Sequence, residues 1–274
     1  MLKRFCLIIL FVLPSHTALA QDAGQLEPLI TALELREVFD AMRGEGLDYG
    51  ADLDRELLEG AGGGGWQDTV GDIYEPDRIW RTFMPRFEAE LQGQDIDAMT
   101  AFFSTTQGQR ITTLEISARR AMLDEAVEQE SRATYQAMLA EGDPRLILLS
   151  ELIEANDLIE FNVMGAMNAS YAFYNGLVDG RAFDFELSQE DILKDVWSQE
   201  PVIRLDTEEW MYAYLALAYA PLSDDELQAY IDFSNSEAGQ ALNAALFAGY
   251  DAVFLNVSKA LGLSAAQLMR GQDL

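Results

Sequence analysis

The sequence predicts an all-α protein, a helical array or bundle that contains two copies of a three-helix module. Apolar residues recur at helical spacing through nearly the whole chain, whereas the alternation typical of strands is scarce. A stretch of about 50 residues recurs 131 positions later, and this offset is too long for a solenoid, whose units span ~20 to 50 residues. We therefore expect a duplicated module.

The first predicted helices lie on either side of glycines. One helix is expected over residues 29–42, ending at Gly44 and Gly46, and a second over residues 47–58, followed by a flexible loop at Gly60–Gly65. Further helices are predicted over residues 79–90, 96–103, 107–140 and 145–177, the last interrupted near Gly165.

Two further features of the sequence predict an anchor residue and a linker between the helices. Trp66 is the expected anchor at the end of the glycine loop. Residues 180–205 form the least regular stretch, with Ser188 and Asp191 spaced as a helix cap and Pro201 as a breaker, so we expect a linker there.

The predicted organisation has six segments. They are a signal peptide (1–20), an N-terminal helical segment (21–74), a first repeat (75–128), central helices and linker (129–205), a second repeat (206–260) and a C-terminal helix or tail (261–274).

The first twenty residues have the layout of a secretory signal peptide. Lys3 and Arg4 supply positive charge, residues 5–13 form an apolar run, and a small-residue site ends at Ala20. The run covers only about half of the ~20 residues that a membrane-spanning helix needs, so a retained anchor is the weaker alternative. We expect cleavage between Ala20 and Gln21 and a periplasmic protein.

Cleavage would remove the only cysteine and the only histidine, Cys6 and His16. The exported chain would then lack disulfides, thiol nucleophiles, histidine-based triads, and zinc or haem sites that use these side chains. We expect no cofactor and no dedicated metal site, and no catalytic residue can be nominated.

The net charge of −29 argues against binding to nucleic acid or to an anionic membrane surface. The acidity indicates either capture of cations or of a basic partner, or simply solubility, which we favour. We expect no membrane span beyond the signal peptide, because the apolar stretch at residues 211–220 is short and closely flanked by acidic residues. The oligomeric state is not predicted.

Residues 102–109 align with residues 233–240 without a gap. Three residues match in place: Phe102 with Phe233, Gly108 with Gly239 and Gln109 with Gln240. A hydroxyl residue, Thr105 or Ser236, is placed to cap the next helix. Glycine costs a helix ~0.5 to 1 kcal/mol relative to alanine, so its recurrence in a first turn indicates close packing without room for a Cβ atom. The glutamines are expected to bind free backbone groups at this corner.

The pattern Phe-x-x-[Ser/Thr]-x-x-Gly-Gln, between an amphipathic helix and a longer one, resembles the DUF2059 domain family. The first copy, extended through residues 74–78 and 114–121, is the more similar. The second lacks the paired arginines at the matching positions and looks degenerate. The resemblance implies a helical domain of exported bacterial proteins, with no established activity and no catalytic residue.

Arg119 and Arg120 are the candidate contact residues. They lie four positions from Glu115 and Asp124, so they form either surface ion pairs within one helix or a site for an anion or a partner's carboxylate. The helix over residues 145–177, rich in aromatic and amide side chains, is either a core helix or the wall of a pocket for an apolar or sugar-like ligand.

Two functions remain compatible with the sequence. The first is a non-enzymatic module that acts in the cell envelope or holds a protein or apolar ligand in a groove between the repeats. The second is a carboxylate-dependent hydrolase such as a glycosidase, which needs two carboxyl groups ~5 to 9.5 Å apart in a cleft. We favour the first.

Overall fold

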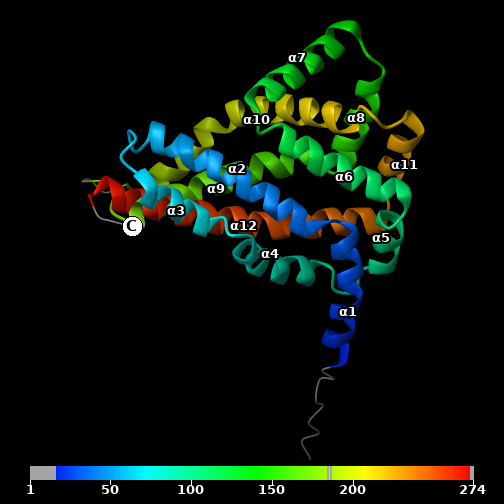
Figure 1. Cartoon of the computed structure of the whole chain (residues 1–274), viewed down its shortest axis with the longest axis horizontal. Helices are drawn as coiled ribbons and strands as arrows, with labels where there is room; N and C mark the ends of the chain where they lie inside the picture. The colour runs from blue at the N-terminus through cyan, green and yellow to red at the C-terminus, as the bar shows by residue number, and fades with distance from the viewer. Residues whose placement is uncertain (1–16, 184, 186, 272–274) are drawn as a thin grey trace, which may run out of the picture.

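The computed structural model describes residues 17–183, 185 and 187–271. This part of the chain folds into twelve α-helices and contains no strand, so the all-α prediction is confirmed (Figure 1). The helices are α1 (Thr17–Ala32), α2 (Leu35–Glu56), α3 (Gly63–Ile73), α4 (Pro76–Glu90), α5 (Ile96–Phe103), α6 (Thr106–Ala121), α7 (Glu125–Glu141), α8 (Arg145–Ala155), α9 (Leu158–Asp179), α10 (Gln189–Tyr219), α11 (Asp224–Ser234) and α12 (Glu237–Met269).

Helix α12 runs through the middle of the molecule and packs against α9 and α4 (Figure 1). It crosses α9 closely, because a Cβ atom on Gly176 would lie 2.3 Å from the carbonyl oxygen of Lys259. Among the described residues, α12 is the one helix that is long and apolar enough to span a membrane, although the sequence led us to expect no such span. A buried core helix has the same composition, and Leu242, Val253 and Leu261 of α12 are buried here.

Two main groups of apolar side chains hold the helices together. The larger joins α1 to α5 with α12 and contains Phe39, Phe83 and Phe87. The second joins α6, α8, α10 and α11, and includes Met211 and Leu215 of the predicted core stretch. Helix α7 lies at the edge and packs mainly on α10 (Figure 1).

The prediction that the first helix ends at Gly44 and Gly46 is wrong, because α2 continues through both. The reason is a tertiary contact: a Cβ atom on Gly46 would lie 2.3 Å from the ring of Tyr74. Gly46 therefore gives Tyr74 room rather than ending the helix. Trp66 is the predicted anchor, since its side chain is 1% exposed and its indole N–H donates to the carbonyl oxygen of Gly50 at 2.7 Å.

Three other predicted boundaries also differ. Residues 107–140 form two helices, α6 and α7, separated by residues 122–124. The break within residues 145–177 lies at Asp157, whose φ of 49° is left-handed, and not near Gly165. The predicted helix boundary before residue 29 is also too late, because α1 begins at Thr17 and a left-handed Glu34 separates α1 from α2.

Ser188 caps α10 as predicted, accepting a hydrogen bond from the backbone N–H of Asp191 at 3.1 Å. Pro201 is not a breaker, because it lies inside α10. A proline leaves the carbonyl four residues before it without a helical partner. Pro201 and Trp197 are both exposed, so water can satisfy that carbonyl and the helix continues.

Candidate functional site

The residues of the repeated pattern make the same local contacts in both places. The hydroxyl of Thr105 accepts from the N–H of Gly108 at 3.0 Å, and that of Ser236 accepts from the N–H of Gly239 at 3.0 Å. A Cβ atom would lie 2.4 Å from a carbonyl oxygen at Gly108 and 2.1 Å at Gly239. The close neighbour that excludes a side chain is thus the end of the preceding helix.

Each repeat glutamine binds two carbonyl groups. The side-chain amide of Gln109 donates to Phe103 and to Ala32, both at 2.8 Å. That of Gln240 donates to Ser234 at 2.7 Å and to Ala155 at 2.5 Å. In both cases the second carbonyl belongs to the last residue of an earlier helix, α1 or α8. The glutamines therefore fasten three helices at each corner.

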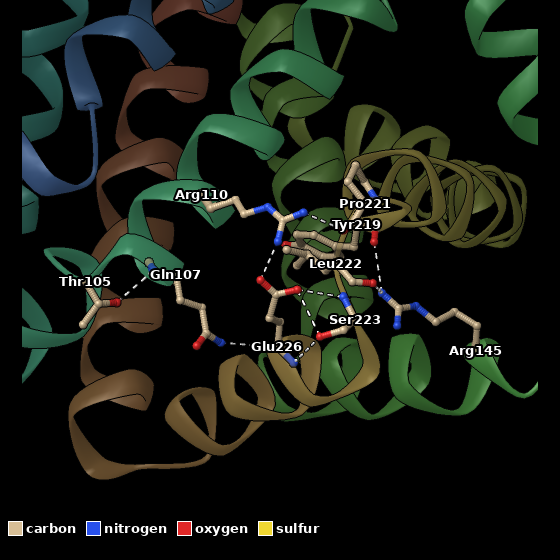
Figure 2. Close-up of polar contacts among 10 residues, drawn as sticks. Thr105, Gln107, Arg110, Arg145, Tyr219, Pro221, Leu222, Ser223 and Glu226 are labelled. Carbon is tan, nitrogen blue, oxygen red and sulfur yellow. Dashed lines mark hydrogen bonds and ion pairs between the residues drawn. The ribbon is translucent and has the colours of Figure 1, made fainter.

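Two arginines reach the turn between α10 and α11 from opposite sides (Figure 2). Arg145 donates to the carbonyl oxygens of Tyr219 at 3.0 Å and Leu222 at 2.8 Å, and Arg110 donates to that of Pro221 at 2.6 Å. These carbonyls lie at and just after the C-terminal end of α10, where helix carbonyls lack partners and cations are favoured. The guanidinium groups thus supplement the one backbone hydrogen bond at this end, from the N–H of Leu222 to the carbonyl oxygen of Tyr219 at 2.9 Å.

The other side of this turn is a capping box at the start of α11. Ser223 and Glu226 bind each other's backbone N–H, at 3.3 and 2.8 Å (Figure 2). Hydrogen bonds from Ser223 are the main cause of the lowered pKa of Glu226, and Arg110 lowers it further. Gln107 also donates to the backbone carbonyl of Glu226 at 2.8 Å. The corner is therefore joined to α6 by two side chains.

Behind this corner, Glu115 of α6 lies in a cluster of tyrosines. The hydroxyl of Tyr219 donates to its carboxylate at 2.5 Å, and that of Tyr214 donates to its backbone carbonyl at 3.0 Å. Burial raises the pKa of Glu115, and hydrogen bonds from Tyr219 and Tyr230 oppose this shift in part. Burial also raises the pKa of Tyr250, which faces the cluster from α12, to about 12. Helices α10 and α11 thus each contribute a tyrosine hydroxyl to this carboxyl group of α6.

Both candidate contact residues are paired with glutamates of α2. Arg119 binds both carboxylate oxygens of Glu45, one of them at 2.7 Å, and Arg120 binds Glu37 at 2.6 Å. Burial alone would lower the pKa of Arg119, but its contacts with Glu45 raise it above the usual value. Neither arginine pairs with its neighbour four positions along the helix. These glutamates already hold both guanidinium groups. Binding of an external anion or a partner's carboxylate by Arg119 and Arg120 stays a prediction.

An open groove of about 500 Å³ lies between α4 and α12. Its lining residues are Arg86 and Glu90 of α4 with Ala248, Asp251, Ala252, Leu255 and Asn256 of α12. Elsewhere, Phe161 of α9 and Phe247 of α12 stack with ring centroids 4.4 Å apart. The groove thus combines an apolar floor with charged groups at its walls.

The polar groups of α9 are mostly paired internally, as a core helix requires. Asn162 and Asn175 each donate to the carbonyl four residues earlier, at 2.7 Å. Asn168 instead donates to the carboxylate of Asp251 at 3.2 Å, at the edge of the groove. The predicted aromatic and amide-rich helix therefore contributes one polar contact to the groove.

The tyrosine cluster and the groove were both missed by the sequence analysis. Each brings together helices that are far apart in the chain, so no short motif could have revealed them.

The fold and these features define an all-helical protein with a mixed apolar and charged surface groove. Residues 77–136 match the family model described as "Uncharacterized protein conserved in bacteria (DUF2059)". The resemblance to this family is therefore confirmed for a segment that covers α4, α5, α6 and most of α7. No curated protein and no solved structure matches the chain.

Proposed function

We propose that this protein is an exported, non-enzymatic helical module that holds a protein or apolar ligand in the groove between α4 and α12. The observation that carries the proposal is the groove itself. Its volume of about 500 Å³ falls within the ~300 to 1,000 Å³ of typical ligand sites. Its lining residues on α4 and on α12 belong to the first and second predicted repeats, respectively.

The fold is compatible with export and cleavage after Ala20. Residues 1–16 lie outside the described residues, and the cleavage site falls in the first turns of α1. Among the side chains of α1 that the structure describes, those that join it to the core, Leu26, Leu29 and Ile30 among them, follow that site. Cleavage would leave these contacts in place. The mass of the protein from a periplasmic fraction tests the cleavage site directly.

We also propose that the chain contains two copies of one unit, the second degenerate. Support comes from the matched caps, glycines and glutamines of the two corners, because unrelated sequences have no reason to share all three. Glu34 and Asp157, both left-handed with φ of 49°, precede α2 and α9 upstream of the two copies, 123 positions apart. Divergence explains why Trp66 is buried whereas Trp197, 131 positions later, is 60% exposed.

Ligand binding in the groove is tested with a substitution that fills part of the groove. Ala252→Trp places a large ring on the floor, and Ala137→Trp makes the same change on the exposed surface of α7. Native mass spectrometry of the exported protein should show a bound molecule that Ala252→Trp loses and Ala137→Trp retains. Equal retention by both variants would exclude the groove as the binding site.

A carboxylate-dependent hydrolase is the second candidate. The observation in its favour is that Glu90 and Asp251 face the same groove from different helices. Asp251 already accepts a hydrogen bond from Asn168, which suits a structural role better than proton transfer. Hydrolysis of a glycan by the purified protein, abolished in both Glu90→Gln and Asp251→Asn, would favour this candidate over binding alone.

A further inference from the structure

An exposed apolar stripe runs along the first half of α10. Its members recur every four residues, so they lie along one side of the helix: Leu193, Trp197, Pro201 and Leu205. Trp197 is 60% exposed and Leu205 is 70% exposed. Ile192 and Val196, on the adjacent side of α10, are buried in a cluster with side chains of α9. The contact with α9 therefore leaves the stripe uncovered within the part of the chain that the structure describes.

The stripe matches a buried one earlier in the chain. The residues that lie 131 positions before its last three members are all buried: Trp66, Val70 and Tyr74. Two glycines of α2 allow that helix to cover them closely. A Cβ atom on Gly46 would lie 2.3 Å from the ring of Tyr74. One on Gly50 would lie 2.7 Å from the side chain of Val70. Within this protein, an apolar stripe of the same spacing is thus covered by a helix.

A row of large exposed apolar side chains marks a surface for association with a partner. The net charge of −29 argues against an anionic membrane surface as that partner. The charged residues around the stripe instead favour a second copy of the chain. They make the stripe complementary to itself when two α10 helices lie antiparallel, as a two-fold symmetric contact between identical chains requires.

The complementary register has its two-fold axis at Pro201. Residues equally far before and after Pro201 then face each other across the pair of helices. In this register Trp197 faces Leu205 of the partner subunit, which places apolar groups together. Lys194 faces Glu208 of the partner subunit, which places opposite charges together. The four side chains of these two pairs are exposed in the single chain and are accessible to a second copy.

A shifted register is less favourable. An axis at Gln199 would set Lys194 against Arg204 of the partner subunit. It would also set Glu190 against Glu208 of the partner subunit, and like charges placed opposite each other disfavour association. Lys194 can turn to a partner, because its ion pair with Glu190 at 2.6 Å is exposed and exposed pairs contribute little.

We propose that the stripe on α10 is the interface of a homodimer, in which two α10 helices pack antiparallel about an axis at Pro201. The stripe is about 18 Å long from residue 193 to residue 205, at ~1.5 Å per residue. A contact of this length is small, so we expect a weak dimer with a dissociation constant on the order of 10 to 100 µM. Added salt should tighten the dimer, because salt screens the repulsion between two chains that each carry a net charge of −29.

The test is sedimentation equilibrium of the full-length mature protein from about 1 µM to about 1 mM. Leu205→Asp places a charge in the stripe and should weaken the dimer about tenfold or more. Ile147→Asp is the matched control, because Ile147 is 62% exposed and the substitution adds the same charge on a different helix, α8. It should leave the dissociation constant unchanged. Thermal unfolding of both variants verifies that they are folded.

An exchange of charges tests the register. Lys194→Glu and Glu208→Lys should each weaken the dimer, because each sets like charges opposite each other, and the double variant should restore the dimer. General repulsion between acidic chains predicts a different pattern, since Glu208→Lys lowers the net negative charge and would then strengthen association.

The homodimer is wrong if the wild-type protein stays monomeric up to about 1 mM. If the monomer instead carries another polypeptide from the periplasm that Leu205→Asp loses and Ile147→Asp retains, the stripe binds a different partner and the second copy is excluded. Equal weakening by Leu205→Asp and Ile147→Asp would place the interface outside the stripe. A double charge exchange that fails to restore the dimer would exclude the axis at Pro201.

Discussion

The rings of Phe102 and Phe233 lie face to face, with centroids 4.1 Å apart and planes inclined by 12°. Phe102 is in the last turn of α5 and Phe233 in the last turn of α11, so the contact joins the family-matched segment to the C-terminal part of the chain. Tyr230 lies parallel to Phe102 at 6.0 Å. The aromatic residues of the two repeat patterns are thus each other's packing partners.

This stack predicts a measurable coupling between the two positions. Phe102→Ala and Phe233→Ala should each destabilise the fold by about 2 to 4 kcal/mol, since both rings are partly buried. In a double-mutant cycle followed by urea unfolding, we expect a coupling energy of about 1 kcal/mol. The stacked pair Phe161 and Phe247, where Phe161 is 39% exposed, is the control and should couple less. Additive single-variant effects at Phe102 and Phe233 would contradict the finding.

The repeat glycines should not tolerate a Cβ atom. Gly108→Ala and Gly239→Ala each place that atom against a carbonyl group, so we expect a loss of about 1 to 3 kcal/mol in the free energy of unfolding. Gly165→Ala is the matched control, because nothing lies within 4 Å of its Cβ position inside α9. It should stabilise the protein by about 0.5 to 1 kcal/mol through helix propensity. Similar effects at all three sites would show that only propensity matters.

Local interactions could be predicted from the sequence because both partners lie a few residues apart. The caps by Thr105, Ser236 and Ser188 follow this rule. The all-α class followed from periodicity, which is likewise local. These predictions needed no knowledge of how the helices pack.

Predictions failed where a distant partner decides the outcome. Gly46 looked like a helix terminator because its partner, Tyr74, is 28 positions away. Glu115 and Arg119 looked like a pair within one helix, yet one binds Tyr219 and the other Glu45. The groove could not be foreseen for the same reason, since α4 and α12 are joined only by the tertiary fold.

The stability of the turn between α10 and α11 should depend more on the hydrogen bonds from Arg145 to backbone carbonyls than on the ion pair between Arg145 and Asp224. Arg145→Ala removes two charged hydrogen bonds to carbonyl groups, which should cost about 1.5 to 3 kcal/mol. Asp224→Ala removes only the exposed partner of its ion pair and should cost about 0 to 1 kcal/mol. Hydrogen exchange at the end of α10 should accelerate in the first variant alone. Equal costs would mean that the ion pair, and not the carbonyl contacts, holds the turn.

The tyrosine cluster predicts a pH dependence of stability with a definite sign. Burial raises the pKa of Glu115 above its ordinary value of 4.5, so the folded state favours the protonated form more than the unfolded chain does. This contribution is fully present below pH 4.5 and is lost as pH rises through the raised pKa. The titratable groups that interact with Glu115 are the hydroxyls of Tyr214, Tyr219, Tyr230 and Tyr250.

Glu115→Gln keeps a neutral side chain at every pH. Glu226→Gln is the matched control, because the pKa of Glu226 is shifted in the opposite direction from that of Glu115. The pKa of Glu226 is lowered, so its stabilising contribution is present above pH 4.5 and is lost as pH falls. Melting temperatures are compared from pH 4 to pH 8. As pH rises, the wild-type protein should lose stability relative to Glu115→Gln. Over the same range it should gain stability relative to Glu226→Gln. If the Glu115→Gln difference stays constant across this range, the carboxyl group does not titrate differently on folding and the cluster is not sensitive to pH.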